Sequence, residues 1–124
     1  MKAKSAPPIT RIVLYVRDMV KVADFYTKHF GFVQDRSEMP GSLQLVSPVG
    51  GCDLMLLQAS KGHRMGQSCI KIVFDVEDIE GFKAKCAKEG LKFGTSHPCE
   101  GYAYASARDP SKNLIQISSR AFRK

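Results

Sequence analysis

Residues 11–19 read RIVLYVRDM, and residues 71–79 read KIVFDVEDI. An isoleucine, two valines and an aspartate recur in register, and a cation stands first in both stretches. Self-similarity of this kind marks a repeated structural unit. Each copy is rich in β-branched residues, which favours a strand. The sequence therefore predicts a pseudo-symmetric domain in which each half opens with a strand.

A helix is predicted after each opening strand. The strands end at Asp18 and Asp78, and aspartate suits a helix N-cap. Apolar residues then recur at three- and four-residue spacing, which is typical of one face of a helix. Gly31 and Gly90 follow these segments and supply the left-handed backbone position that commonly ends a helix.

Three short strands are predicted after each helix. Pro40-Gly41 and Gly50-Gly51 mark turns in the first copy, and the segment 109–112 marks the last turn of the second. The predicted strands span 32–37, 42–47 and 53–58 in the first copy, and 92–95, 102–107 and 113–118 in the second. The fold class is thus α+β, with two βαβββ modules. We expect residues 1–124 to form one domain, with modules at 9–58 and 68–119 and a linker at 59–67.

The predicted strands have two different faces, because side chains alternate along a strand. One face is wholly apolar and is expected to pack against the helices; its members are Ile12, Leu14, Val16, Leu54, Leu56, Ile72, Phe74, Val76, Ile115 and Ile117. The other face mixes charged and apolar residues: Arg11, Val13, Tyr15, Asp53, Met55, Leu57, Lys71, Val73, Asp75, Leu114, Gln116 and Ser118. A mixed face commonly meets solvent or ligand. We expect the modules to form a curved mixed sheet with the helices on its convex face, so that the mixed face lines a concave cleft, the default place for a ligand.

The composition excludes several classes of protein. Hydrophobic residues make up 44% of the chain and charged residues 25%, as in globular domains. No apolar run reaches the length of about 18 residues that spans a membrane, and no signal peptide is evident, so a cytoplasmic protein is expected. The four cysteines lack Cys-x-x-Cys spacing, which argues against structural zinc. The net charge of +7 is scattered along the chain, so nucleic-acid binding is not predicted.

Two motifs resemble a known family. Residues 11–32, RIVLYVRDMVKVADFYTKHFGF, resemble the opening module of the vicinal oxygen chelate superfamily, which includes glyoxalases, bleomycin resistance proteins and extradiol dioxygenases. Residues 109–116, DPSKNLIQ, resemble the last turn and strand of these proteins, in which the turn usually reads Asp-Pro-x-Gly-Asn. The similarity covers about residues 9–119 and implies the same fold of paired βαβββ modules.

The resemblance also implies where a metal would lie. Metal-binding members hold a divalent cation with one residue from the first strand and one from the last strand of each module. The matching positions here are Arg11, Met55, Lys71 and Gln116, of which only the glutamine is a metal ligand. Two cations about 4 Å apart already repel by roughly 4 kcal/mol at an effective dielectric constant near 20. We therefore predict no metal and no other cofactor.

The predicted function is metal-independent binding of a small molecule, as the resemblance to the bleomycin resistance branch implies. The residues Arg11 and Lys71 predict that this molecule is anionic, although bleomycin resistance proteins hold a cationic drug in an acidic groove. Arg11 and Lys71 would bind the anionic group through their charges, and apolar residues would line the cleft. Tyr102 and Tyr104 would stack on the ligand or hydrogen-bond to it. The predicted ligand site comprises Arg11, Val13, Tyr15, Met55, Lys71, Val73, Asp75, Tyr102 and Gln116.

Three alternatives stay open. Asp53 and Asp75 would neutralise the two cations if they lie beside them. The chain could also be an enzyme of the same superfamily, of lyase, isomerase or dioxygenase type, that uses side-chain acids and bases on a small organic substrate. A structural or regulatory role is the third possibility. A homodimer is expected in each case.

Overall fold

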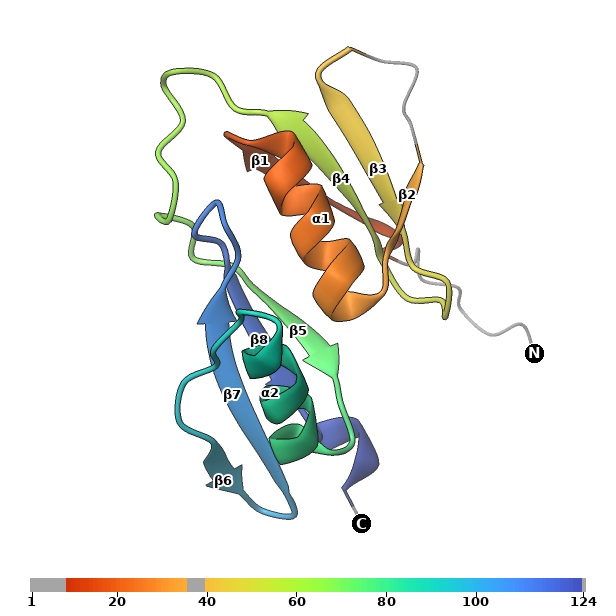
Figure 1. Ribbon diagram of the computed structural model, residues 1–124, viewed down its shortest axis with the longest axis vertical. Coiled ribbons are helices and arrows are strands. Elements are labelled where there is room, and N and C mark those ends of the chain that lie inside the picture. The colour runs from red at the N-terminus through yellow and green to blue at the C-terminus, as the bar shows by residue number, and fades with distance from the viewer. Residues whose placement is uncertain (1–8, 36–39, 124) are drawn as a thin grey trace, which may run out of the picture. The chain divides into compact units, whose positions relative to one another are not determined.

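The computed structural model describes residues 9–35 and 40–123. The chain divides between Ser60 and Lys61 into two compact units. Each unit has one helix and one four-stranded mixed sheet, and the elements follow the order βαβββ in both. Figure 1 shows the repeat of this arrangement in the two units. The predicted α+β class and the two βαβββ modules are confirmed.

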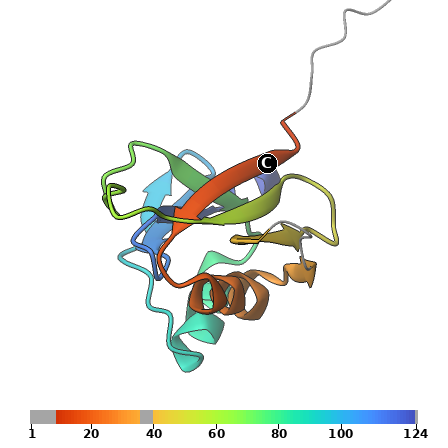
Figure 2. The same ribbon diagram turned by 90° about the horizontal axis from the view of Figure 1, so that it is seen from above.

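The first unit contains β1 (Arg11–Val16), α1 (Met19–Phe30), β2 (Val33–Asp35), β3 (Ser42–Val46) and β4 (Asp53–Gln58). Its strand order is β1-β4-β3-β2. The β1 and β4 strands are parallel, whereas the other two pairs are antiparallel. Helix α1 lies along one face of this sheet, as the view from above makes clear (Figure 2).

The second unit contains β5 (Lys71–Asp75), α2 (Ile79–Lys88), β6 (His97–Cys99), β7 (Tyr102–Arg108), β8 (Leu114–Ser118) and a short 3₁₀ helix, η1 (Arg120–Phe122). Its strand order is β5-β8-β7-β6, with β5 and β8 parallel. The first and last strands of the module, β5 and β8, therefore lie next to each other, as β1 and β4 do in the first unit.

Both helices begin and end where the sequence predicts. The Asp18 Oδ1 atom accepts a hydrogen bond from the backbone N–H of Lys21 at 3.0 Å, and Asp78 Oδ1 accepts one from Gly81 at 3.0 Å. These bonds satisfy N–H groups that have no partner inside the helix. Gly31 and Gly90 have φ angles of 77° and 94°, which is the left-handed region that glycine tolerates.

The core consists of the apolar strand face and the inner faces of the helices. The strand residues Val16, Leu54, Leu56, Ile115 and Ile117 are buried, as the alternation predicts. The helices contribute Val22, Ala23, Tyr26, Ile79 and Cys86. On the other strand face, Val13, Tyr15 and Val73 are exposed. Among the described residues, no helix is long and apolar enough to cross a membrane.

The predicted strand at 92–95 is wrong, because the second unit forms its edge strand later, at His97–Cys99. Side chains of α2 hold the segment instead. Phe93 packs against Phe82, with ring centroids 6.3 Å apart, and the Ser96 hydroxyl bonds both to Lys83 Nζ and to the Glu80 carboxylate. In the first unit, β2 starts at Val33 rather than at residue 32, and residues 36 and 37 of the predicted strand lie outside the described residues.

Candidate functional site

A hollow of about 600 Å³ lies on the mixed face of the second unit and is called the larger hollow here. Its lining comes from β5, β7, β8 and η1, all within one unit. The lining residues are Lys71, Val73, Asp75, Tyr102, Tyr104, Gln116, Ser118, Arg120 and Ala121. Basic, acidic, aromatic and apolar groups thus border a single space.

Strand register fixes the order of these groups along the larger hollow. Lys71 stands at the start of β5, and Val73 lies beside Gln116 in the middle. Asp75 lies beside Ser118 at the far end, and Tyr104 flanks Ser118 on the other side. Arg120 then follows the end of β8, where η1 begins. The larger hollow therefore has Lys71 at one end, and Asp75, Tyr104 and Arg120 at the other.

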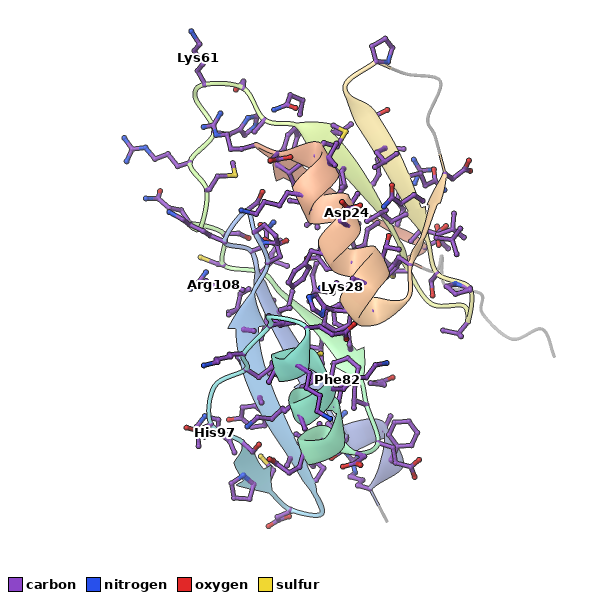
Figure 3. All side chains as sticks on the ribbon, in the orientation of Figure 1. Asp24, Lys28, Lys61, Phe82, His97 and Arg108 are labelled. Carbon is purple, nitrogen blue, oxygen red and sulfur yellow. The ribbon has the colours of Figure 1, made fainter. Side chains whose placement is uncertain are left out.

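Two side chains of the larger hollow are held in place by neighbours. Gln116 Nε2 donates a hydrogen bond to the Ser106 hydroxyl at 3.3 Å, which orients the amide. The Tyr104 ring lies against the His97 ring of the edge strand β6, with centroids 5.2 Å apart; Figure 3 labels His97 on that strand. Because His97 braces the ring, Tyr104 offers a positioned aromatic surface.

Neither cation of the predicted pair forms an ion pair with Asp53 or Asp75, both of which the structure describes. Asp53 lies opposite Arg11, but its Oδ1 accepts the backbone N–H of Ser47 at 2.9 Å. Asp75 lies four residues along β5 from Lys71, about 13 Å away on an extended strand. Within residues 9–35 and 40–123, no ion pair joins Arg11 or Lys71 to a carboxylate.

A smaller hollow of about 450 Å³ is lined by Cys99, Glu100, Tyr102, Arg120 and Arg123. It shares Tyr102 and Arg120 with the larger hollow. Cys99 and Tyr102 pair across the turn between β6 and β7. A hydrogen bond with the Cys99 side chain is the main cause that raises the pKa of Tyr102, while the charges of Arg120 and Arg123 act in the opposite direction.

The sequence-predicted site residues fall into two groups. Lys71, Val73, Asp75, Tyr102 and Gln116 line the larger hollow. Arg11, Val13, Tyr15 and Met55 lie on the mixed face of the first unit's sheet, where Val13 pairs with Met55 and the Arg11 guanidinium is 3.7 Å from the Met55 sulfur. Their part in ligand binding stays a prediction.

Sequence reasoning missed Arg120 and Ala121 in the larger hollow and Arg123 in the smaller one. These residues belong to η1 and its C-cap, where strand alternation no longer applies. The cluster of Arg120, Arg123 and Lys124 near the C-terminus was the available signal. Ser118 lies on the mixed face that alternation predicts, although it was not assigned to the site.

The residues at the four metal positions do not fit a divalent metal. The Arg11 guanidinium offers only hydrogen-bond donors and no lone pair for a metal, and its Nη1 lies 3.7 Å from the Met55 sulfur. In the second unit, the Lys71 ammonium likewise offers no lone pair, and the Gln116 amide donates to Ser106. Across the described ranges, no group of three or more His, Cys, Asp or Glu side chains is arranged to hold a metal ion.

One protein family matches the sequence of this chain. The sequence profile of the Glyoxalase/Bleomycin resistance protein/Dioxygenase superfamily matches residues 9–117. Among curated proteins, none matches the chain significantly.

Solved structures share the fold at low sequence identity. An antibiotic binding protein from Streptomyces sp. CB03234 is 19% identical with a TM-score of 0.75, covering 93% of this chain and 97% of that chain. Lactoylglutathione lyase from Agrobacterium tumefaciens is 20% identical with a TM-score of 0.70, covering 90% and 94%. An integron cassette protein from the mobile metagenome of the Halifax Harbour sewage outfall is 16% identical with a TM-score of 0.76, covering 92% and 99%.

Proposed function

This chain belongs to the Glyoxalase/Bleomycin resistance protein/Dioxygenase superfamily, and from that premise we propose that it binds a small, anionic, partly apolar organic molecule without using a metal. The observation that carries the proposal is the larger hollow, which combines Lys71 and Arg120 with two tyrosines. Its volume of about 600 Å³ lies within the usual range for small-molecule sites.

The charge distribution supports an anionic ligand. Lys71 and Arg120 both line the larger hollow, and neither forms an ion pair with a carboxylate of the described residues. A cation that is covered by a ligand needs a counterion, because an uncompensated buried charge costs several kcal/mol. Asp75 in the same hollow would accept a hydrogen bond from a hydroxyl or amine of the ligand.

A non-catalytic role is supported by the way the titratable groups are spread out. Lys71 and Asp75 stand at opposite ends of β5, so they do not form an acid–base pair with each other. One solved relative is described as an antibiotic binding protein. Another is a lactoylglutathione lyase, which keeps an enzyme of this superfamily as the alternative.

Thermal-shift measurements with matched anionic, neutral and cationic aromatic compounds test the proposal. A ligand at a hundred times its dissociation constant should stabilise the protein by about 2.7 kcal/mol. Lys71→Ala should weaken that stabilisation, whereas Lys92→Ala, which changes an exposed lysine outside the larger hollow, should leave it intact.

Two results would contradict the proposal. Stabilisation by cationic or neutral compounds but not by anions would show that the site does not select an anionic ligand. Conversion of a bound compound to product in the presence of a chelator would favour the enzyme alternative.

A further inference from the structure

We propose that the smaller hollow is the carboxylate subsite of this ligand site, and that the ligand is an aromatic carboxylate. Arg120 and Arg123 would hold the carboxylate, and the aromatic ring would extend past Tyr102 into the larger hollow. The inference rests on the proposed function and names the class of its ligand. It assigns the anion to the C-terminal arginines rather than to Lys71.

The two arginines of the smaller hollow are available for an anion. Their guanidinium groups form no ion pair with Glu100, which lines the same hollow, or with any other carboxylate in the described part of the chain. Their backbones are tied down, because Arg120 N donates to Ser118 Oγ at 3.2 Å and Arg123 N donates to Arg120 O at 3.3 Å. Guanidinium groups bind a carboxylate through two parallel hydrogen bonds, which a lysine cannot match. The charged residues that line the smaller hollow are Arg120, Arg123 and Glu100, so the hollow has a net positive charge.

Lys71 is too far along the sheet to share the same carboxylate. It pairs with Leu114 at the start of β8, whereas Arg120 follows the end of that strand at Ser118. The backbones are therefore separated by about 13 Å of strand or more. Lys71 would instead meet a polar group at the opposite end of the ligand.

The junction of the two hollows favours an aromatic ring next to the carboxylate. Tyr102 lines both hollows. Tyr104 lines the larger hollow with its ring braced by His97, and Val73 and Ala121 add apolar surface. Aromatic rings prefer offset or edge-to-face contact with other rings, at centroid distances of about 4.5–7 Å. A flat ring placed between the tyrosines would have such partners.

Cys99 provides a direct probe of this subsite, because its exposed thiol lines the smaller hollow. Two aromatic disulfides are compared: dithiobis(nitrobenzoate), which carries carboxylates, and neutral dithiodipyridine. In either reaction the Cys99 thiolate attacks one sulfur, the reagent's S–S bond breaks, a mixed disulfide forms and an aromatic thiolate leaves. The ratio of the two rate constants cancels the thiolate fraction of Cys99 and reports the effect of the reagent's charge.

The matched control is Cys69, an exposed thiol that lines neither hollow. The Cys69→Ser variant removes the control thiol and the Cys99→Ser variant removes the probed thiol. Peptide mass spectrometry assigns the label among the cysteines that remain, including Cys52 and the buried Cys86. The preference for the carboxylate reagent should be about tenfold or more greater at Cys99, since focused positive potential raises local anion concentration by that order. It should fall to the Cys69 value in Arg123→Ala and Arg120→Ala, and Arg123→Lys should retain part of it. Added salt should weaken it.

Equal preference at the two thiols, or a Cys99 preference that survives both arginine substitutions, would overturn the subsite. A second measurement separates this failure from failure of the proposed function. If an aromatic carboxylate stabilises the wild-type protein and the Arg123→Ala variant equally, the ligand site stands and only the subsite is wrong. If no anionic compound stabilises the wild-type protein, the proposed function fails and the subsite fails with it.

Discussion

At the scale of single residues, the turn that precedes β8 shows how one carboxylate organises a loop. Asp109 is buried, and its Oδ1 accepts the backbone N–H groups of Ser111 and Asn113, each at 2.9 Å. Its Oδ2 accepts the Asn113 side-chain amide at 2.9 Å. Hydrogen bonds within residues 109–113 therefore stabilise this turn. The turn leads directly into β8, the strand that carries Gln116 and Ser118.

Lys112 in this turn is strained, and its replacement by glycine should stabilise the protein. Its φ angle is 67°, and among the described residues it is the one non-glycine with positive φ. A left-handed backbone costs an L-residue roughly 1 kcal/mol or more. We therefore expect Lys112→Gly to raise the free energy of unfolding by about 1 kcal/mol, measured by urea denaturation. Lys112→Val should lower it, because β-branching worsens the same clash. An unstable glycine variant would mean that contacts of the Lys112 side chain outweigh the strain.

At the scale of elements, the caps of the two helices differ in one respect. Both use an aspartate whose Oδ1 accepts the N–H three residues later, but that later residue is Lys21 in α1 and Gly81 in α2. A Cβ atom on Gly81 would lie 2.3 Å from Asp78 Oδ2. The glycine in the first turn of α2 thus leaves room for the capping carboxylate.

This contact predicts a coupling between Asp78 and Gly81. In the Asp78→Ala background, Gly81→Ala should stabilise by about 1 kcal/mol, the usual difference in helix propensity. In the wild-type background the same change should be close to neutral, because the new methyl group displaces a cap worth about 1 kcal/mol. Denaturation of the four proteins gives the coupling energy. Additive effects would show that Asp78 retains its cap by rotating away from the methyl group.

Elements were predictable from the sequence wherever one local signal decided them. Asp18, Asp78, Gly31 and Gly90 mark the helix ends through bonds between neighbours in the chain. The prediction of a strand at 92–95 was wrong because contacts with α2 determine the conformation of that segment. The contacting residues are Phe82, labelled in Figure 3, and Lys83, which bonds to Ser96 from 13 residues earlier in the chain. A pattern confined to residues 92–95 does not reveal them.

At the scale of the whole molecule, the candidate site could be predicted only in part. Strand alternation predicted that Lys71, Val73, Asp75 and Gln116 share one face, and they line the larger hollow. Arg120 and Arg123 were missed because they follow the last strand, where side-chain direction has no simple period. Involvement of the Arg11 face in binding, and dimer formation, stay predictions.

The protein as purified should hold no stoichiometric transition metal. The positions that the family resemblance implies for a metal carry Arg11, Met55 and Lys71. Guanidinium and ammonium groups donate hydrogen bonds only, so they have no lone pair to offer a divalent cation. Elemental analysis after dialysis should therefore find zinc, nickel, manganese and iron well below one per chain, and a chelator should leave the melting temperature unchanged. Stoichiometric metal that disappears in Gln116→Ala would contradict this.

The edge strand β6 has a consequence for solubility. Its middle residue is Pro98, which has no backbone N–H, and the strand is the outermost in the order β5-β8-β7-β6. An incoming strand from another molecule would find a missing donor in the centre of this three-residue edge. The strand that contacts Tyr104 is therefore also a poor template for aggregation, so this margin of the larger hollow can stay open to solvent without recruiting further chains.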